Sequence, residues 1–227
     1  MTSSSRKPLD VSVIIPTLNE QDHVAAAIQS AQAAGAGETI ISDGGSTDDT
    51  QATATAAGAT KFVRSLPGRG TQLAGGLSVA AGEVVLFLHA DNLLSVDCLN
   101  QICQLDEFVW GAFKQQIDSH KPIYRAIELG NAARVSWRGM AFGDQAIFAN
   151  RKALMSHGGV SEIPLMEDVD LSRRLRKLAR PVLLDGPVQI SSRRWEQTGV
   201  LRQTIRNWTL QVRYAAGATP ESLADRY

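Results

Sequence analysis

The chain has 227 residues, of which 44% are hydrophobic and 20% are charged, so it is long enough to bury a sizeable core. Lysine plus arginine and aspartate plus glutamate each number 23, and this balance gives no support to a general affinity for nucleic acid. Two cysteines, an N-terminal stretch unlike a signal peptide, and no run of 18 apolar residues favour a cytoplasmic protein that does not span a membrane.

Up to residue 90 the chain alternates between short apolar strands and helices. We predict strands over 11–15, 39–42, 61–64 and 83–88, and helices over 20–34, 46–57 and 70–81. Pro16 ends the first strand, and Ser46 begins a Ser-Thr-Asp-Asp segment that resembles a capping box. This alternation predicts an α/β fold with a parallel sheet and right-handed connections.

The second half of the chain is less regular. Cys98 and Cys103 lie in a predicted helix but on different faces, which argues against a disulfide or a metal pair. Because there is no repeat, linker or low-complexity segment, residues 1–227 are predicted to form one domain. Further strands are predicted over 108–116 and 144–150, and further helices over 167–179 and 199–216.

The stretch with the most chemical content is VVLFLHADNLL at 84–94, an apolar run that ends in His89, Ala90 and Asp91. Ligands of open α/β sheets gather at the carboxyl ends of such strands. A carboxylate there, with a histidine two residues earlier, is well placed to hold a divalent metal. The segments VSVIIPTLNE and, far downstream, MEDVDLSRRLR add a second strand end and further acids. Together they suggest transfer of a group from a nucleotide diphosphate.

Five segments, VSVIIPTLNE, DGGSTDDT, GEVVLFLHAD, GDQAIF and MEDVDLSRRL, occur in the order seen in family 2 glycosyltransferases. Over about residues 10–195 the chain resembles this family, and most of all a small bacterial subfamily with GRG, FLHAD and RRW signatures. The resemblance implies a Rossmann-like GT-A fold, with a mostly parallel sheet flanked by helices. It also implies a nucleotide-sugar-binding half, about 10–92, and an acceptor-binding half, about 93–227, that includes a C-terminal helix.

The first donor-binding residues implied by the resemblance follow the first strand. Pro16, Thr17 and Glu20 lie where the family binds the nucleotide, and backbone amides there can approach a ligand closely. The alternative is that Thr17 or Asn19 caps the following helix, with Glu20 favourable in its first turn.

Two more candidate donor residues lie on glycine-rich turns. Asp43 occupies the family's base-recognition position, but Gly44 replaces the second acid of the family pattern, and a plain turn is the alternative. Arg69 in the GRG loop is the candidate phosphate ligand, and the neighbouring glycines would let backbone amides approach phosphate oxygens. The alternative for this loop is a solvated turn.

The segment His89-Ala90-Asp91 corresponds to the family's Asp-x-Asp metal signature, with His89 in place of the first acid. Asp91 is expected to bind Mg²⁺ or Mn²⁺ that bridges the donor's two phosphates and neutralises charge on the departing diphosphate. His89 either ligates this metal or is a packed residue at the end of the strand. Ala90 is expected to contact the donor.

The acidic pair Glu167 and Asp168 corresponds to the place of the family's general base, and Asp168 is the better match. Its task would be to take the proton of the acceptor hydroxyl as that oxygen attacks the sugar. Asp170 is the competing carboxylate. The alternative is that these acids only stabilise the first turn of a helix.

The acceptor side is implied by two further motifs. Asp144 and Gln145 lie where the family shapes the acceptor site, although a turn is the alternative for Asp144. Arg194 and Trp195 belong to an RRW segment in which Trp195 could stack on the acceptor and the arginine could meet phosphate. The full Gln-x-x-Arg-Trp form is absent, so processive synthesis does not follow.

The amphipathic stretch 201–214 suits either packing against its own domain or a second subunit, which we favour, or peripheral contact with a membrane. The sequence thus predicts an inverting, metal-dependent glycosyltransferase that moves a sugar from a nucleotide-diphospho-sugar to an unidentified hydroxyl acceptor, either a small molecule or lipid-linked. Two alternatives are a catalytically idle nucleotide-sugar-binding protein and a nucleotidyltransferase.

Overall fold

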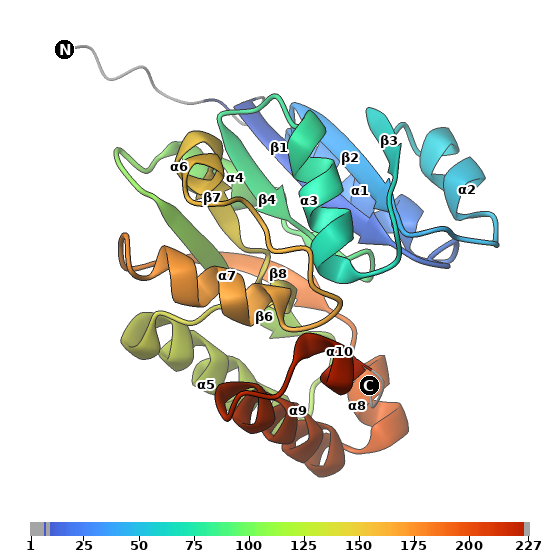
Figure 1. Cartoon of the computed structure of the whole chain (residues 1–227). Coiled ribbons are helices and arrows are strands. Elements are labelled where there is room, and N and C mark those ends of the chain that lie inside the picture. The colour runs from blue at the N-terminus through green and yellow to red at the C-terminus, as the bar shows by residue number, and fades with distance from the viewer. Residues whose placement is uncertain (1–6, 8–9, 225–227) are drawn as a thin grey trace.

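The computed structural model describes residue 7 and residues 10–224, and it describes only the backbone of Arg194, Gln197, Leu201, Gln203, Asn207 and Ala224. Within these residues eight strands form one sheet in the order β3-β2-β1-β4-β7-β6-β8-β5, with helices on both faces (Figure 1). The strands are β1 (Val11–Thr17), β2 (Glu38–Asp43), β3 (Lys61–Arg64), β4 (Val84–Phe87), β5 (Asn92–Leu94), β6 (Trp110–Ile117), β7 (Phe148–Asn150) and β8 (Val182–Ile190).

The helices, like the strands, are numbered along the chain. They are α1 (Val24–Ala33), α2 (Thr50–Ala56), α3 (Arg69–Val79), α4 (Cys98–Cys103), α5 (Pro122–Arg138), α6 (Arg151–Ser156), α7 (Glu167–Leu175), α8 (Arg193–Thr198), α9 (Val200–Ala215) and α10 (Pro220–Ala224), with a short 3₁₀ helix η2 (Gly143–Gln145) between α5 and β7.

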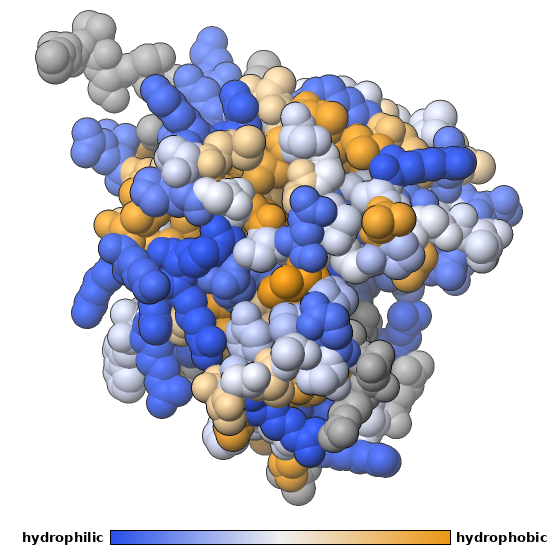
Figure 2. Space-filling model, viewed as in Figure 1, coloured by the Kyte–Doolittle hydropathy of each residue, from blue (hydrophilic) through white to orange (hydrophobic). Residues whose placement is uncertain are grey.

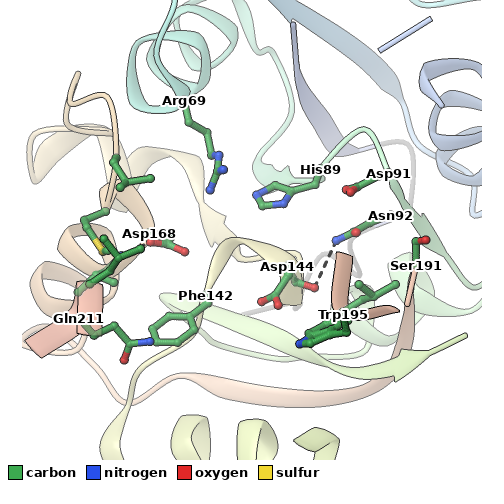
Figure 3. Close-up of a pocket in the computed structure, with 15 residues that line it drawn as sticks. Arg69, His89, Asp91, Asn92, Phe142, Asp144, Asp168, Ser191, Trp195 and Gln211 are labelled. Atoms are coloured by element: carbon green, nitrogen blue, oxygen red, sulfur yellow. Dashed lines mark hydrogen bonds between the residues drawn. The ribbon is translucent and has the colours of Figure 1, made fainter. Parts of the chain in front are cut away.

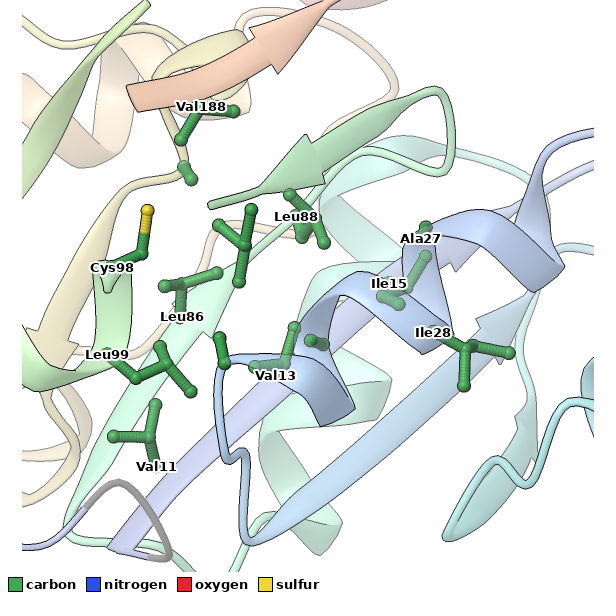
Figure 4. Close-up of a cluster of buried hydrophobic side chains, with 14 of the residues drawn as sticks. Val11, Val13, Ile15, Ala27, Ile28, Leu86, Leu88, Cys98, Leu99 and Val188 are labelled. Atoms are coloured by element: carbon green, nitrogen blue, oxygen red, sulfur yellow. The ribbon is translucent and has the colours of Figure 1, made fainter. Parts of the chain in front are cut away.

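The N-terminal half of the sheet is parallel, as predicted. β1 pairs in parallel with β2 and with β4, and β3 extends the sheet beyond β2. Successive side chains of a strand point to opposite faces, so Val13 and Ile15 pack in one cluster with Ile28 of α1, whereas Ile14 packs in another with Leu73 of α3 (Figure 4). The strands therefore read as continuous apolar runs because they are buried on both faces.

The capping box predicted at Ser46 is wrong. The backbone N–H and the hydroxyl of Ser46 both donate to the Asp43 carboxylate, which holds residues 43–46 in a turn. The helix begins only at Thr50, whose backbone N–H donates to Asp48 Oδ1 at 3.0 Å. Similarly, the first regular residue of α1 is Val24 and its N-cap position is His23, so neither Thr17 nor Asn19 caps this helix.

The C-terminal half of the sheet is mixed. β7 runs antiparallel to β4 and β6, β8 runs parallel to β6, and β5 runs antiparallel to β8. The strand predicted over 144–150 is only Phe148–Asn150, because residues 143–145 form η2. α5 was not predicted, because Tyr124 and Val135 are its buried residues and so few buried positions produce little apolar periodicity.

The C-terminal helix α9 packs on its own domain through one face, as we favoured. Leu210 joins a small cluster with Met166 and Val169 of the α7 region. The other face leaves apolar side chains exposed, among them Trp208 at 70% and Val212 at 68%. In the described part of the chain, no helix has the length and apolar character needed to cross a membrane. A cytoplasmic location, contact with a membrane surface and a homodimer stay predictions.

Candidate active site

Two pockets meet at the carboxyl ends of β1 and β4. One, which we call the β1 pocket, is lined by Pro16, Thr17, Glu20, Gln72 and Ala90 together with Arg69, His89 and Asp91. The other, the α7 pocket, is lined by Asp144, Asp168 and Trp195 and by the same Arg69, His89 and Asp91 (Figure 3). The residues predicted for the donor side and those predicted for the acceptor side thus line one continuous cleft.

The turn after β4 delivers His89 and Asp91 to this cleft. It is closed by the backbone N–H of Asn92, which donates to the carbonyl of His89 at 3.1 Å. The imidazole of His89 lies against η2, and a Cβ added to Gly143 would come within 2.5 Å of His89 Nε2. This contact favours the packed alternative for His89, while metal ligation by Asp91 and His89 stays a prediction.

The two candidate bases differ in where they point. Asp168 lines the α7 pocket; its Oδ2 accepts the backbone N–H of Gly143 at 2.8 Å and its Oδ1 accepts that of Val169 at 2.7 Å. Asp170 instead accepts from the Ser161 hydroxyl at 2.6 Å and forms an ion pair with Arg174 at 2.8 Å. Of the two, Asp168 is the carboxylate that faces the cleft.

Glu167 forms a buried ion pair at the edge of the cleft. Its side chain is 1% exposed, and its Oε1 lies 3.3 Å from Nη1 of Arg69. Burial raises the pKa of Glu167 to about 7; the nearby Asp168 adds to the rise, and Arg69 opposes it. Glu167 Oε2 has no hydrogen-bond partner within the described residues. In the sequence, Glu167 was identified only as the neighbour of Asp168, and no motif indicated its contact with Arg69 of the GRG loop.

One glycine of the GRG loop is engaged within the protein. The expectation that the glycines of this loop bring backbone amides to a phosphate does not hold for Gly70, because its N–H donates to the carbonyl of Ile163 at 3.1 Å; for Gly68, which lines the β1 pocket, it stays a prediction. A Cβ at Gly70 would lie 2.2 Å from the carbonyl oxygen of Ser161, so glycine is required for the close approach of two backbones. The guanidinium of Arg69 points into the cleft (Figure 3).

Asp43 holds a turn. Its carboxylate is buried and accepts hydrogen bonds from the Thr17 hydroxyl at 3.0 Å and from the backbone of Gly45 and Ser46 at 3.0 and 2.9 Å. Asp43 lies behind the β1 pocket, which Thr17 lines. A direct contact between Asp43 and a nucleobase stays a prediction.

The glycine that departs from the family pattern has a packing reason. A Cβ at Gly44 would meet Gln72 Nε2 at 3.0 Å and the Cα of Pro67 at 3.3 Å. Gln72 fills this space and donates to the carbonyls of Thr17 at 2.6 Å and Ser42 at 3.2 Å. Gln72 is a pocket-lining residue that sequence reasoning missed, since a glutamine inside a helix carries no recognisable motif.

The residues predicted for the acceptor side divide between the cleft and the interior. Asp144 lines the α7 pocket, and burial, opposed chiefly by Arg134, raises its pKa. Gln145 is fully buried and accepts from Arg134 Nη2 at 2.7 Å, so it braces η2 instead of lining the cleft as predicted. Trp195 lines the cleft and meets the Tyr124 ring edge-on at 5.9 Å, whereas the side chain of Arg194 lies outside the described part.

Several apolar residues of the cleft had no signal in the sequence. Met166 adopts a positive φ of 68° immediately before α7, and this backbone turn starts the helix where Asp168 faces the cleft. Leu165 lines both pockets, and Phe142 lines the α7 pocket. Apolar residues in irregular segments follow no periodicity, so only the folded chain identifies them as part of the site.

Comparison with solved structures confirms the GT-A fold predicted from the sequence. Glucosyl-3-phosphoglycerate synthase from Mycobacterium tuberculosis, solved with Mg²⁺ and UDP, matches with a TM-score of 0.56 at 20% identity, over 80% of this chain and 68% of that one. A mannosyltransferase from Pyrobaculum calidifontis, solved with GDP-Man and Mn²⁺, matches with a TM-score of 0.64 at 19% identity, over 79% and 56% of the two chains. At these identities the likeness concerns the fold alone.

Comparison by sequence identifies the family. Glucosyl-3-phosphoglycerate synthase of Mycolicibacterium paratuberculosis is 36% identical over 92 residues, which cover 36% of this chain and 28% of that protein. The synthase of Mycolicibacterium smegmatis is 34% identical over 92 residues and is covered to 30%, so the match spans less than a third of these relatives. The profile described as glycosyl transferase family 2 matches residues 12–150, more than half of the chain, and the chain therefore belongs to that family.

Proposed function

We propose that this chain transfers a sugar from a nucleotide-diphospho-sugar to an acceptor hydroxyl, with inversion at the anomeric carbon and with Mg²⁺ or Mn²⁺ as cofactor. The observation that carries the proposal is the junction of the β1 and α7 pockets at Arg69, His89 and Asp91. A donor in the first pocket and an acceptor in the second would have their reacting groups side by side. The UDP and GDP-Man complexes of proteins with this fold support the choice of donor class.

On the donor side, Pro16, Thr17, Glu20 and Ala90 receive the nucleotide at the strand ends. Arg69 reaches the junction from the first turn of α3 and carries the positive charge that a diphosphate needs there. Its ion pair with buried Glu167 fixes the guanidinium in place. Arg69 thus holds the diphosphate at the junction while the sugar is transferred to the acceptor.

The residues at the junction fit a divalent cation that the donor helps to bind. No cluster of three or more His, Cys, Asp or Glu side chains suited to a metal occurs in the part of the chain that the structure describes. Mg²⁺ is commonly held by one or two carboxylates, substrate phosphates and water, and Asp91, with His89 beside it, suits such a site. When bound, the cation stabilises the negative charge of the leaving diphosphate.

On the acceptor side, Asp168 is the general base. The acceptor oxygen attacks the anomeric carbon, its proton passes to the Asp168 carboxylate, and the bond from that carbon to the diphosphate breaks. The two backbone N–H groups that donate to Asp168 hold the carboxylate in one orientation. One displacement with one base inverts the configuration. Asp144 and Trp195 position the acceptor by hydrogen bonding and stacking.

The two departures from the family pattern do not favour an idle protein. At Gly44, the side chain of Gln72 fills the space that a side chain would occupy. At His89, the absence of a side chain on Gly143 leaves room for the imidazole ring. Each departure has a local packing partner, so neither requires the loss of catalysis. A nucleotidyltransferase would release pyrophosphate from a nucleoside triphosphate, and this release is the assay that distinguishes it.

The test is calorimetric titration with UDP-, GDP- and dTDP-sugars, each in Mn²⁺, Mg²⁺ or EDTA. We expect one donor to bind in a metal-dependent manner, to lose this dependence in Asp91→Ala, and to keep it in Asp168→Asn. If no donor binds under any metal condition, the transferase proposal is wrong. Tight donor binding without release of nucleoside diphosphate, with any acceptor or with water, would instead favour an idle binding protein.

A further inference from the structure

A groove of about 730 Å³ separates α5 from α9, which lie near each other at the lower end of the molecule in Figure 1. Its α5 wall consists largely of small or apolar residues, including Ala126, Ile127, Gly130 and Ala133. Gly130 is three or four residues from each of the other three, so these positions lie on one side of the helix. The α9 wall includes Trp208 and Val212. The two helices therefore present apolar surface toward each other.

The groove is continuous with the cleft of the proposed function. Phe142, Asp144, Trp195 and Gln211 line both the groove and the α7 pocket. A molecule whose hydroxyl reaches Asp168 in that pocket would therefore extend into the groove. This continuity argues for a part of the acceptor as the occupant, because a partner that covered only the outer helix faces would have no reason to enter the cleft.

The groove is open, and most of the surface that it offers is apolar. A Cβ added to Gly130 would meet no atom within 4 Å, and Trp137 at its far end is 83% exposed. Two arginines line the groove. Arg134 stacks on the Phe142 ring at 3.6 Å and donates to Gln145, so its charge is engaged inside the protein, whereas Arg138, next to Trp137 at the far end, is exposed. In Figure 2 the hydrophobic residues of the visible face lie mainly in its upper half and near its centre, and only a few show at the lower end, where α9 lies in the same view.

We propose that this groove holds a hydrocarbon chain of the acceptor, so that the substrate class is an amphiphile whose hydroxyl reaches Asp168 while its apolar chain lies between α5 and α9. This rests on the proposed function and adds the chemistry of the acceptor to it. From Ala126 to Trp137 the groove follows roughly 17 Å of helix, given a rise of 1.5 Å per residue, which suits an extended chain better than a single ring.

The test uses n-alkyl β-D-glucosides of increasing chain length, from methyl to octyl, below their micelle concentrations. Trp137, Trp195 and Trp208 line the groove and Trp110 is fully buried, so a change in tryptophan fluorescence reports occupation of the groove. We expect the dissociation constant to fall about threefold for each added methylene that becomes buried. Equal affinity for methyl and octyl glucoside would overturn the inference.

The decisive variant is Gly130→Leu, which adds a bulky side chain to the groove wall at a position where a Cβ meets no atom within 4 Å. Its matched control is Leu129→Gln, since Leu129 is 72% exposed and does not line the groove. We expect Gly130→Leu to weaken octyl glucoside binding about tenfold or more, and Leu129→Gln to leave it unchanged. Far-UV circular dichroism and metal-dependent donor binding, measured on the same samples, check that both variants are folded.

The outcomes separate this inference from the proposed function. Donor binding without preference for longer alkyl chains contradicts the groove assignment alone, whereas absence of donor binding contradicts the proposed function. Octyl binding that persists in Gly130→Leu places the chain elsewhere and overturns the inference. A wild-type dimer that Gly130→Leu dissociates, with no alkyl binding, would show that a second copy of this chain occupies the groove.

Discussion

The two sides of the cleft differ in how tightly they are packed. On the β1 side, a Cβ at Gly70 of α3 would lie 2.2 Å from the backbone oxygen of Ser161. On the other side, a Cβ at Gly130 of α5 would meet no atom within 4 Å. A closely packed wall fixes the shape of a pocket, whereas an open groove tolerates ligands of different shapes. The comparison suggests that the β1 side binds one kind of nucleotide, whereas the α5–α9 side accommodates acceptors of different shapes.

The buried carboxylates of the two sides show the same contrast. Asp43, behind the β1 pocket, accepts hydrogen bonds on both of its oxygens from Thr17, Gly45 and Ser46. Asp144, on the acceptor side, has an Oδ1 atom without a hydrogen-bond partner among the residues described. A buried acceptor that its own protein leaves unpaired gains most from a ligand hydroxyl. The β1 side is therefore organised by internal bonds, and the acceptor side is left to be completed by a substrate.

The largest expected effect is on catalysis from the acceptor side. Asp168→Asn should slow release of nucleoside diphosphate from the donor about a thousandfold, because the base is removed while the side chain keeps its shape. Donor affinity should stay the same, since Asp168 lines only the α7 pocket. The matched control is Asp170→Asn, whose carboxylate pairs with Arg174, and it should retain most of the activity. Equal loss in both variants would show that the base lies elsewhere.

Removal of the Asp91 carboxylate should instead weaken donor binding in the β1 pocket. In Asp91→Ala, the affinity for the donor in Mn²⁺ should fall about a hundredfold, to the value that the wild type shows in EDTA. The measurement is a titration of both proteins with and without the metal. If the variant keeps a metal-dependent affinity, His89 or another residue holds the cation.

The packing contrast can be tested with one substitution in α3. Gly70→Ala should destabilise the protein by about 3 kcal/mol, because the new methyl group would overlap the carbonyl oxygens of Ser161 and Ile163. Chemical denaturation gives the free energy of unfolding. This outcome would oppose the usual gain from replacing glycine by alanine inside a helix. An unchanged stability would mean that the loop at 161–163 moves away at little cost and that the β1 side is less rigid than inferred.

Much of the β1 side could be predicted from the sequence, because its signals are local. Buried parallel strands such as Val11–Thr17 and Val84–Phe87 are continuous apolar runs, and a strand end fixes where Asp91 must lie. The capping prediction at Ser46 failed for a different reason. The Asp43 carboxylate accepts hydrogen bonds from that serine, and this contact across the turn outweighs the local preference of the segment.

The acceptor side could be predicted only in part, because its geometry depends on contacts between distant segments. Asp168 was found from its motif, but its distinction from Asp170 rests on Gly143 and Ser161, which lie outside α7. Gln145 was placed in the cleft because it neighbours Asp144, whereas the 3₁₀ turn sends it into the interior. α5 was missed altogether, because a helix that lines an open groove lacks an apolar stripe of normal width.

Two buried glutamates should respond to pH in opposite ways. The pKa of Glu167 is raised to about 7, mainly by burial, so the folded state binds the extra proton and the free energy of unfolding should fall as pH rises from 4.5 toward 7. The expected fall is on the order of 3 kcal/mol. Glu38 is also desolvated, which raises its pKa, but hydrogen bonds from Ala81, Lys61 and Ser12 outweigh this and lower it. Its contribution to stability is present above 4.5 and should be lost as pH falls below that value.

The measurement is denaturant unfolding as a function of pH for the wild type, Glu167→Gln and Glu38→Gln. Glu167→Gln should flatten the profile between pH 4.5 and 7, because the glutamine carries no charge at either end of that range. Glu38→Gln should leave that window unchanged and remove only the loss on the acidic side. If Glu167→Gln leaves the profile unchanged, its ion pair with Arg69 keeps the carboxylate ionised throughout.

The smallest expected effect is a gain in stability on the open side. Gly130→Ala should raise the free energy of unfolding by about 1 kcal/mol, since alanine favours the helix more than glycine and its methyl group meets no atom within 4 Å. The result pairs with Gly70→Ala, in which the same chemical change inside another helix should have the opposite sign. A loss of stability in both would show that α5 is constrained by contacts as close as those of α3. A gain in stability in Gly130→Ala alone would show that α5, unlike α3, has free space beside it, and this is the space that a long acceptor would occupy.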